Sequence, residues 1–182
     1  FHTFRYMEIT GLVYKPYSAD STGLVLHTDV EPCNSFICSS KVLNQIQRMT
    51  ARTFLCNLFS VQSDCPARER FGYGGDLNAV SESYICNFDM QSFYRKTIYD
   101  WIDAIRDSGF VDTAPFIGLA YCGISWESAF LITQYHLYVY YNDLDLVREM
   151  YPFNLQWMAK VARLHPEGLV EKIGRASCRE RA

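Results

Sequence analysis

The sequence has no hydrophobic run long enough to cross a membrane. Its most apolar stretch, residues 130–141, is interrupted by Thr133, Gln134 and His136. A membrane-spanning helix needs about 18 to 20 consecutive apolar residues. The sequence therefore predicts no membrane span.

Basic charge is also scarce. The chain has 17 Lys and Arg residues against 20 Asp and Glu residues, a net charge of −3, and its basic residues are scattered. Proteins that bind nucleic acid concentrate Lys and Arg on one face, because these side chains neutralise phosphates. Nucleic acid is therefore not expected as a partner.

The seven cysteines lack the spacing of a metal site or a disulfide scaffold. There is no C-x-x-C pair, and the four histidines are too dispersed to complete a zinc site. One disulfide, between Cys33 and Cys38, stays open if the protein is secreted. Cys65 and His136 are interpreted as packing residues, and G-x-S-x-G and phosphate-loop motifs are missing. We expect no metal and no cofactor.

Apolar and aromatic residues are what the sequence has in abundance. Of its 182 residues, 49% are hydrophobic and 15% are aromatic. This length and composition predict a packed core of about one domain. Aromatic side chains are typical both of carbohydrate sites and of large cores, so composition leaves those two interpretations open.

The first two segments of the chain differ in their periodicity. Residues 1–33 contain two β-rich stretches around a polar turn, and we interpret them as the C-terminal end of a β-sandwich domain. Residues 34–62 carry apolar side chains at 3.6-residue spacing behind Ser39 or Ser40, either of which can cap a helix. This second segment is predicted to be a linker helix.

The third segment, residues 63–172, is predicted to be helical, so the fold class is mainly α. Helical patterns cover residues 79–86, 89–108, 125–141 and 144–150, and a last one begins near Pro152. The pattern at 125–141 is apolar on nearly every side, which is typical of a helix in an inner layer. Pro152 is expected at the first position of its helix, where a missing N–H costs nothing.

The last segment, residues 173–182, is interpreted as a non-native tail. Its sequence I-G-R-A-S-C-R-E-R-A resembles one translated frame of a common sequencing adapter. The alternative is that this segment is a genuine basic tail of the protein. If it is non-native, we expect it to contribute nothing to the fold.

A loop at residues 64–76 concentrates groups that can do chemistry. Its sequence D-C-P-A-R-E-R-F-G-Y-G-G-D holds three carboxylates, two guanidiniums and three glycines. Glycoside hydrolysis uses a carboxylic acid to protonate the leaving oxygen, and further polar groups to hold the sugar. A solvated, charged turn is the alternative interpretation, and the residue types alone leave both open.

The same loop resembles the signature of the bacterial and fungal α-L-rhamnosidases, glycoside hydrolase family 78. The resemblance continues through residues 1–172, at the segments F-R-Y-M-E-I-T-G (4–11), N-F-D (87–89), F-Y-R-K (93–96), S-W-E-S-A (125–129) and Y-Y-N-D (140–143). It implies that residues 63–172 are the N-terminal part of an (α/α)6 barrel, a six-hairpin glycosidase fold. It also implies an inverting enzyme that releases terminal α-L-rhamnose from glycosides or polysaccharides.

The resemblance also implies roles for individual residues. Glu69 corresponds to the general acid. The substrate-binding positions correspond to Asp64, Arg68, Tyr73, Asp76 and Trp126. Tyr73, where many members have Trp, and Trp126 would form apolar walls against the sugar ring.

Two departures from the family pattern limit this transfer. Glu127 and Ser128 stand where Gly-Asp is common, so Glu127 is either a sugar ligand or an acid at a helix start. No carboxylate of this chain corresponds to the family's catalytic base. We therefore expect the 182-residue chain alone to be inactive. A related glycosidase of other sugar specificity and a non-catalytic carbohydrate-binding homologue are the alternative functions.

Overall fold

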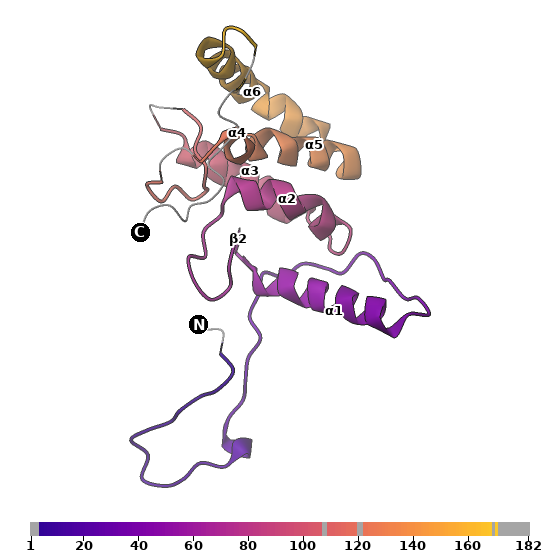
Figure 1. Ribbon diagram of the computed structural model, residues 1–182, viewed down its shortest axis with the longest axis vertical. Helices are drawn as coiled ribbons and strands as arrows, with labels where there is room; N and C mark the ends of the chain where they lie inside the picture. Colours follow the sequence, from indigo (N-terminus) through magenta and orange to yellow (C-terminus); the bar gives the residue numbers. More distant parts are fainter. Residues whose placement is uncertain (1–3, 107–108, 120–121, 169, 171–182) are drawn as a thin grey trace.

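The computed structural model describes residues 4–106, 109–119, 122–168 and 170 (Figure 1). Its helices are α1 (Lys41–Cys56), α2 (Gly74–Ile85), α3 (Gln91–Ala104), α4 (Ile124–Glu127), α5 (Ala129–Tyr141), α6 (Leu144–Leu164) and a 3-10 turn, η1 (Ser18–Asp20). Strands β1 (Leu58–Phe59) and β2 (Val61–Gln62) pair as an antiparallel ribbon. The prediction of a mainly α chain is confirmed.

Helix α5 is the centre of the packing. It contacts α2, α3 and α6, and these helices lie in successive layers (Figure 1). The fully buried side chains between them include Trp101 and Tyr94 of α3 and Phe130 and Leu137 of α5. Each such side chain contributes roughly 1.5 to 3 kcal/mol through burial. This core fixes the two helical hairpins, α2–α3 and α5–α6, on which the candidate site rests.

Only one face of α5 is buried, which corrects the expectation that this segment is enclosed on nearly every side. Tyr135 and Val139 on its other face are 62% and 51% exposed. Helix α6 continues this apolar surface with Tyr151, Leu155 and Met158, which are all more than half exposed. Among the described residues nothing covers this surface, although its composition is that of a core.

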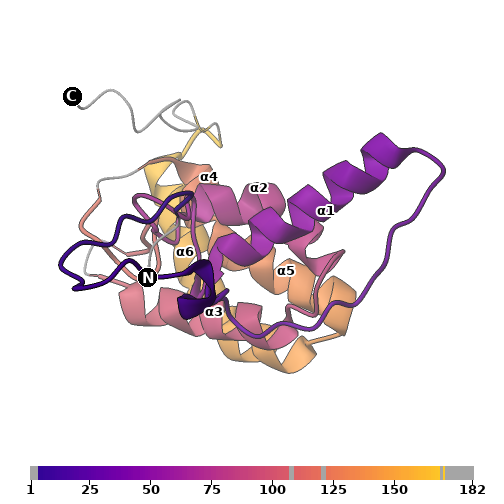
Figure 2. The same ribbon diagram turned by 90° about the horizontal axis from the view of Figure 1, so that it is seen from below.

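Helix α1 begins where its sequence predicts. The backbone N–H of Leu43 donates to Ser40 Oγ at 3.4 Å, so Ser40 is the N-cap. The C-terminal half packs on α2, where the Phe54 and Tyr84 rings stack with centroids 4.0 Å apart. The N-terminal half projects beyond the other helices (Figure 2). Its exposed apolar residues are Val42, Leu43, Ile46 and Met49.

The strands predicted in residues 1–33 are not formed in the described part of that segment. Residues 4–33 contain the 3-10 turn and otherwise irregular backbone, and the segment runs away from the helices (Figure 1). A strand is stable only beside a hydrogen-bonded neighbour, and no strand pairing reaches this stretch within the described residues. Near its end, Pro32 makes a single bridge to Phe88. Membership of a β-sandwich stays a prediction.

Two helix boundaries also differ from the prediction. Residues 125–141 form two helices, with Ser128 between α4 and α5. Pro152 lies inside α6 rather than at the start of a helix. A proline in a helix interior costs about 3 kcal/mol, but Leu146 and Trp157 anchor the two halves of α6 in the core. Tertiary packing therefore outweighs the local preference. No described helix is long and apolar enough to span a bilayer.

We expect the isolated 182-residue chain to bind the hydrophobic dye ANS and to self-associate, because the α5–α6 surface is apolar and open. Dye fluorescence and sedimentation measure this. Replacing Val139 and Leu155 by Lys should lower both without reducing the helical circular dichroism signal. A monomer that binds no dye would contradict the exposed surface.

Candidate functional site

The loop at residues 64–71 is closed by its own ends. The Phe71 N–H donates to Asp64 Oδ1 at 3.0 Å, and the Asp64 N–H donates to the Phe71 carbonyl oxygen at 3.2 Å. Inside the loop, Arg70 Nε donates to the Pro66 carbonyl oxygen at 3.1 Å. One carboxylate oxygen of Asp64 is therefore engaged in holding the loop. This closure presents the residues between the two ends to solvent.

Glu69 lies at the tip of this loop in a strained conformation. Its φ is +54°, and that of Arg70 is +62°, a region that costs a side chain-bearing residue about 1 kcal/mol. The Glu69 side chain is exposed, and its Oε2 accepts a hydrogen bond from the Tyr73 hydroxyl at 3.3 Å. Backbone strain of this kind concentrates at functional sites, because the surrounding structure must maintain it.

The chain after Glu69 is fixed by a short antiparallel contact with residues 112–114. Tyr73 forms a bridge with Thr113, and the Gly74 N–H donates to the Asp112 carbonyl oxygen at 2.9 Å. A Cβ at Gly72 would lie 2.3 Å from the Ala114 carbonyl oxygen, so this approach requires glycine. The contact positions the start of α2.

Trp126 packs on the first turn of α2. A Cβ at Gly74 would lie 2.0 Å from the Trp126 carbonyl oxygen, and one at Gly75 would lie 2.5 Å from Cε2 of its indole. Any larger residue at these positions would displace the tryptophan. The two glycines therefore bring Trp126, about 50 residues later in sequence, beside the first turn of α2, which carries Asp76.

Three carboxylates converge at this point. Asp76 lies in the first turn of α2 and is partly buried. Burial raises the pKa of Asp76 above its ordinary value, and the nearby charges of Asp64 and then Glu69 raise it further. Asp76 is therefore close enough to Asp64 and Glu69 for their charges to act on it. Within the described residues, no group of three or more His, Cys, Asp or Glu side chains has the arrangement of a metal site.

Arg68 is the exposed cation of the site. Its guanidinium makes no ion pair among the described residues. Nearby, the Asp64 carboxylate accepts a hydrogen bond from the Cys65 thiol, which raises the pKa of that thiol, while the hydrogen bond with Arg68 lowers it. Cys65 therefore lies in the loop between two predicted site residues, rather than in the core as a packing residue.

Glu127 lies in the first turn of α4, in agreement with the helix-start alternative, and α6 engages its side chain. Its side chain is 7% exposed and forms an ion pair with Lys160, whose Nζ lies 2.7 Å from Oε1. Trp157 Nε1 donates to its Oε2 at 3.2 Å. Both oxygens are thus engaged by α6. Glu127 ties the helix that carries Trp126 to the next hairpin.

Asp112 is a site-adjacent carboxyl that sequence reasoning missed. It is 5% exposed, its Oδ2 accepts the Cys122 N–H at 3.0 Å, and its Oδ1 has no hydrogen-bond partner among the described residues. Burial raises its pKa to about 6, although the Cys122 hydrogen bond opposes the shift and the charge of Glu127 adds to it. The only sequence signal for Asp112 is its position directly before the Gly- and Pro-containing segment 113–123.

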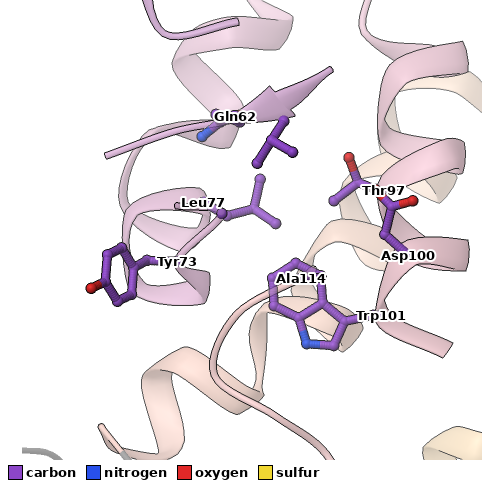
Figure 3. Close-up of a pocket in the computed structure, with 9 residues that line it drawn as sticks. Gln62, Tyr73, Leu77, Thr97, Asp100, Trp101 and Ala114 are labelled. Carbon is purple, nitrogen blue, oxygen red and sulfur yellow. The ribbon is translucent and has the colours of Figure 1, made fainter. Parts of the chain in front are cut away.

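A cavity of about 10 Å³ lies behind Tyr73, between Gln62, Leu77 and Trp101 (Figure 3). That volume accommodates about one water molecule. The buried Nε2 of Gln62 has no partner among the described residues. The Tyr73 hydroxyl points away from these side chains (Figure 3). A sugar is too large for this cavity.

We expect Gly75→Ala to destabilise the contact between α2 and Trp126, because the new methyl group would overlap the indole. Overpacking of this kind costs roughly 1 to 3 kcal/mol. The control is Gly23→Ala, since a Cβ there meets nothing within 4 Å. Thermal unfolding of the full-length protein should show a lower Tm and a red-shifted tryptophan emission for Gly75→Ala alone. Equal Tm values would contradict the close approach.

A second prediction concerns Asp112. Because its folded pKa, about 6, lies above the ordinary value of 3.8, the folded state binds this proton more tightly than the unfolded state. The stability that Asp112 contributes is therefore present at low pH and is lost as the pH rises from about 4 to about 6. Asp112→Asn removes this titration, and it should flatten the fall in Tm between pH 4.5 and 7.5. Parallel Tm profiles would contradict the assignment.

Comparison with protein families supports the resemblance drawn from the loop. The model of the bacterial alpha-L-rhamnosidase 6 hairpin glycosidase domain matches residues 31–177. That range covers the six α-helices formed by the described residues. It ends inside the segment predicted to be a non-native tail, which lies outside the described residues.

Curated relatives and solved structures carry the same name. Alpha-L-rhamnosidases of Streptomyces avermitilis and Formosa agariphila are 31% and 30% identical over 93% and 84% of this chain. The alpha-L-rhamnosidase structure from Dictyoglumus thermophilum has a TM-score of 0.79 at 34% identity, over 83% of this chain and 17% of its own. The Streptomyces avermitilis enzyme, solved with L-rhamnose, has a TM-score of 0.72 at 27% identity, over 75% of this chain and 14% of its own.

The chain spans 17% of the length of both curated relatives. The family match and the structural neighbours confirm the predicted fold class, a partial (α/α)6 barrel of the six-hairpin type. This chain therefore belongs to the bacterial alpha-L-rhamnosidase six-hairpin glycosidase family.

Proposed function

We propose that the full-length protein containing this chain is an inverting α-L-rhamnosidase, and that this chain supplies the general acid and part of the sugar site. The observation that carries the proposal is the proximity of Asp64 and Glu69 of the loop to Asp76 in the first turn of α2, the turn against which Trp126 packs. Glycoside hydrolysis uses a carboxylic acid to protonate the leaving oxygen, and aromatic side chains offer apolar surface to a sugar ring. The names of the relatives support rhamnose as the sugar.

Glu69 is the residue best placed to act as the acid. It is exposed at the loop tip, so a glycosidic oxygen can reach it. Its Oε2 is engaged by Tyr73, while Oε1 makes no hydrogen bond within the described residues. A proton on Oε1 would pass to the leaving oxygen as the glycosidic bond breaks.

The other site residues would hold the sugar. Asp76 and the second oxygen of Asp64 can accept hydrogen bonds from sugar hydroxyls, and the exposed guanidinium of Arg68 can donate to them. Trp126 offers an apolar face for the methyl group and ring carbons. Tyr73 contributes little apolar surface, because its side chain is only 6% exposed.

Inversion also needs a second carboxylate, about 6.5 to 9.5 Å from the first, which activates a water molecule. We assign this base to the part of the protein outside these 182 residues. The isolated chain is accordingly expected to show no turnover. No metal or cofactor enters the proposed reaction.

The direct test is Glu69→Gln in the full-length protein. Loss of a general acid should lower kcat on 4-nitrophenyl α-L-rhamnoside by about 100- to 10,000-fold, with little change in Tm. Glu167→Gln is the matched control, because Glu167 is exposed and follows α6 in the sequence, outside the segments that carry the predicted site residues.

Normal turnover by Glu69→Gln would refute its role as the acid. Wild-type activity on another aryl glycoside, and none on the rhamnoside, would instead indicate a glycosidase of different specificity. Binding of L-rhamnose without turnover of any aryl glycoside would indicate a carbohydrate-binding homologue.

A further inference from the structure

Tyr73 faces the candidate site with its hydroxyl rather than with its ring. Its side chain is 6% exposed, and the ring meets Phe71 edge-on with centroids 6.0 Å apart. The atom directed away from the cavity behind it is the hydroxyl oxygen (Figure 3). The ring is therefore not available as a platform for a sugar, which revises the apolar wall expected from the sequence.

The hydroxyl has a defined partner. It donates to Glu69 Oε2 at 3.3 Å, four residues back along a loop that is not helical. Residues four apart are neighbours on a helix, but residues 69–73 are not helical, so this hydrogen bond has another origin. It arises because the loop turns sharply at Glu69 and Arg70, both with positive φ, and brings the glutamate back over Tyr73.

Tyr73 itself has little freedom to move. Its backbone bridges Thr113, and the neighbouring Gly72 carbonyl and Gly74 N–H make hydrogen bonds to residues 114 and 112. Glu69 lacks such support, because its side chain is exposed on a strained backbone. The anchored hydroxyl therefore holds the exposed Glu69 carboxyl group in one orientation.

We propose that Tyr73 is a positioning residue, which engages Oε2 of Glu69 and so presents the proton on Oε1 to the leaving oxygen. This inference rests on the proposed function of Glu69. Proton transfer helps most when the leaving group is a poor one, since an acidic phenol leaves without protonation. A misplaced acid should therefore lower the rate of hydrolysis selectively for substrates with poor leaving groups. A damaged sugar site should instead lower the rate equally for all substrates.

The test is Tyr73→Phe in the full-length protein, assayed on 2,4-dinitrophenyl, 4-nitrophenyl and phenyl α-L-rhamnosides. We expect kcat on the phenyl substrate to fall by about 10-fold, the size of effect that the loss of one hydrogen bond produces. On the dinitrophenyl substrate kcat should change by less than about 2-fold, and KM should stay near the wild-type value on all three.

Tyr99→Phe is the matched control. Tyr99 also donates to a glutamate, Glu149 Oε2 at 2.8 Å, but this pair joins α3 to α6 on the surface. Tyr99→Phe removes the same hydroxyl group from the same kind of hydrogen bond, and this substitution should change no kinetic constant. If Tyr73→Phe folds poorly, Tyr73→Met fills similar space without a hydroxyl and serves as the second variant.

Combination with Glu69→Gln separates positioning from a structural role. If Tyr73 acts through Glu69, Tyr73→Phe should have no further leaving-group effect in the Glu69→Gln background. An equal loss on all three substrates, or an undiminished effect in that background, would overturn the positioning role while leaving the rhamnosidase proposal intact. No wild-type turnover of any rhamnoside would overturn both.

Discussion

The close approach between the start of α2 and Trp126 is the constraint on which the site depends. Gly74 and Gly75 leave no room for a Cβ, and the main chain and indole of Trp126 fill that space. The approach joins two helical hairpins at one point and sets an aromatic side chain against the turn that carries Asp76. A site assembled this way is as rigid as the core behind it.

Two buried carboxyl groups, those of Asp112 and Glu127, stabilise the segments that form this contact. Asp112 receives the Gly74 N–H on its carbonyl and the Cys122 N–H on its carboxylate. Glu127 follows Trp126 in the chain and is held by Lys160 of α6. Because unpaired buried charges are costly, these partners fix the relative positions of the segments that carry them. The loop acids remain accessible, whereas the acids behind them act in the scaffold.

Local chemistry made much of the fold predictable. Ser40 caps α1 as its hydroxyl suggests, and the glycines of the loop mark where the backbone approaches Trp126. The prediction of strands in residues 1–33 failed in the described part of that segment, because an alternating pattern of side chains does not supply the neighbouring strand that a strand must pair with. Pro152 was predicted to begin a helix, but it lies inside α6, because buried residues on both sides of it keep the helix continuous. The sequence does not signal the burial of Asp112, since that burial is created by residues far along the chain.

The central claim is that the loop acids and Trp126 form one sugar site, and a crystal structure of the full-length protein with L-rhamnose tests it most directly. We expect one face of the sugar to lie against Trp126, with the sugar hydroxyls bound to Asp64, Arg68 and Asp76 and the anomeric carbon near Glu69. Rhamnose bound elsewhere, with these side chains facing only solvent, would contradict it.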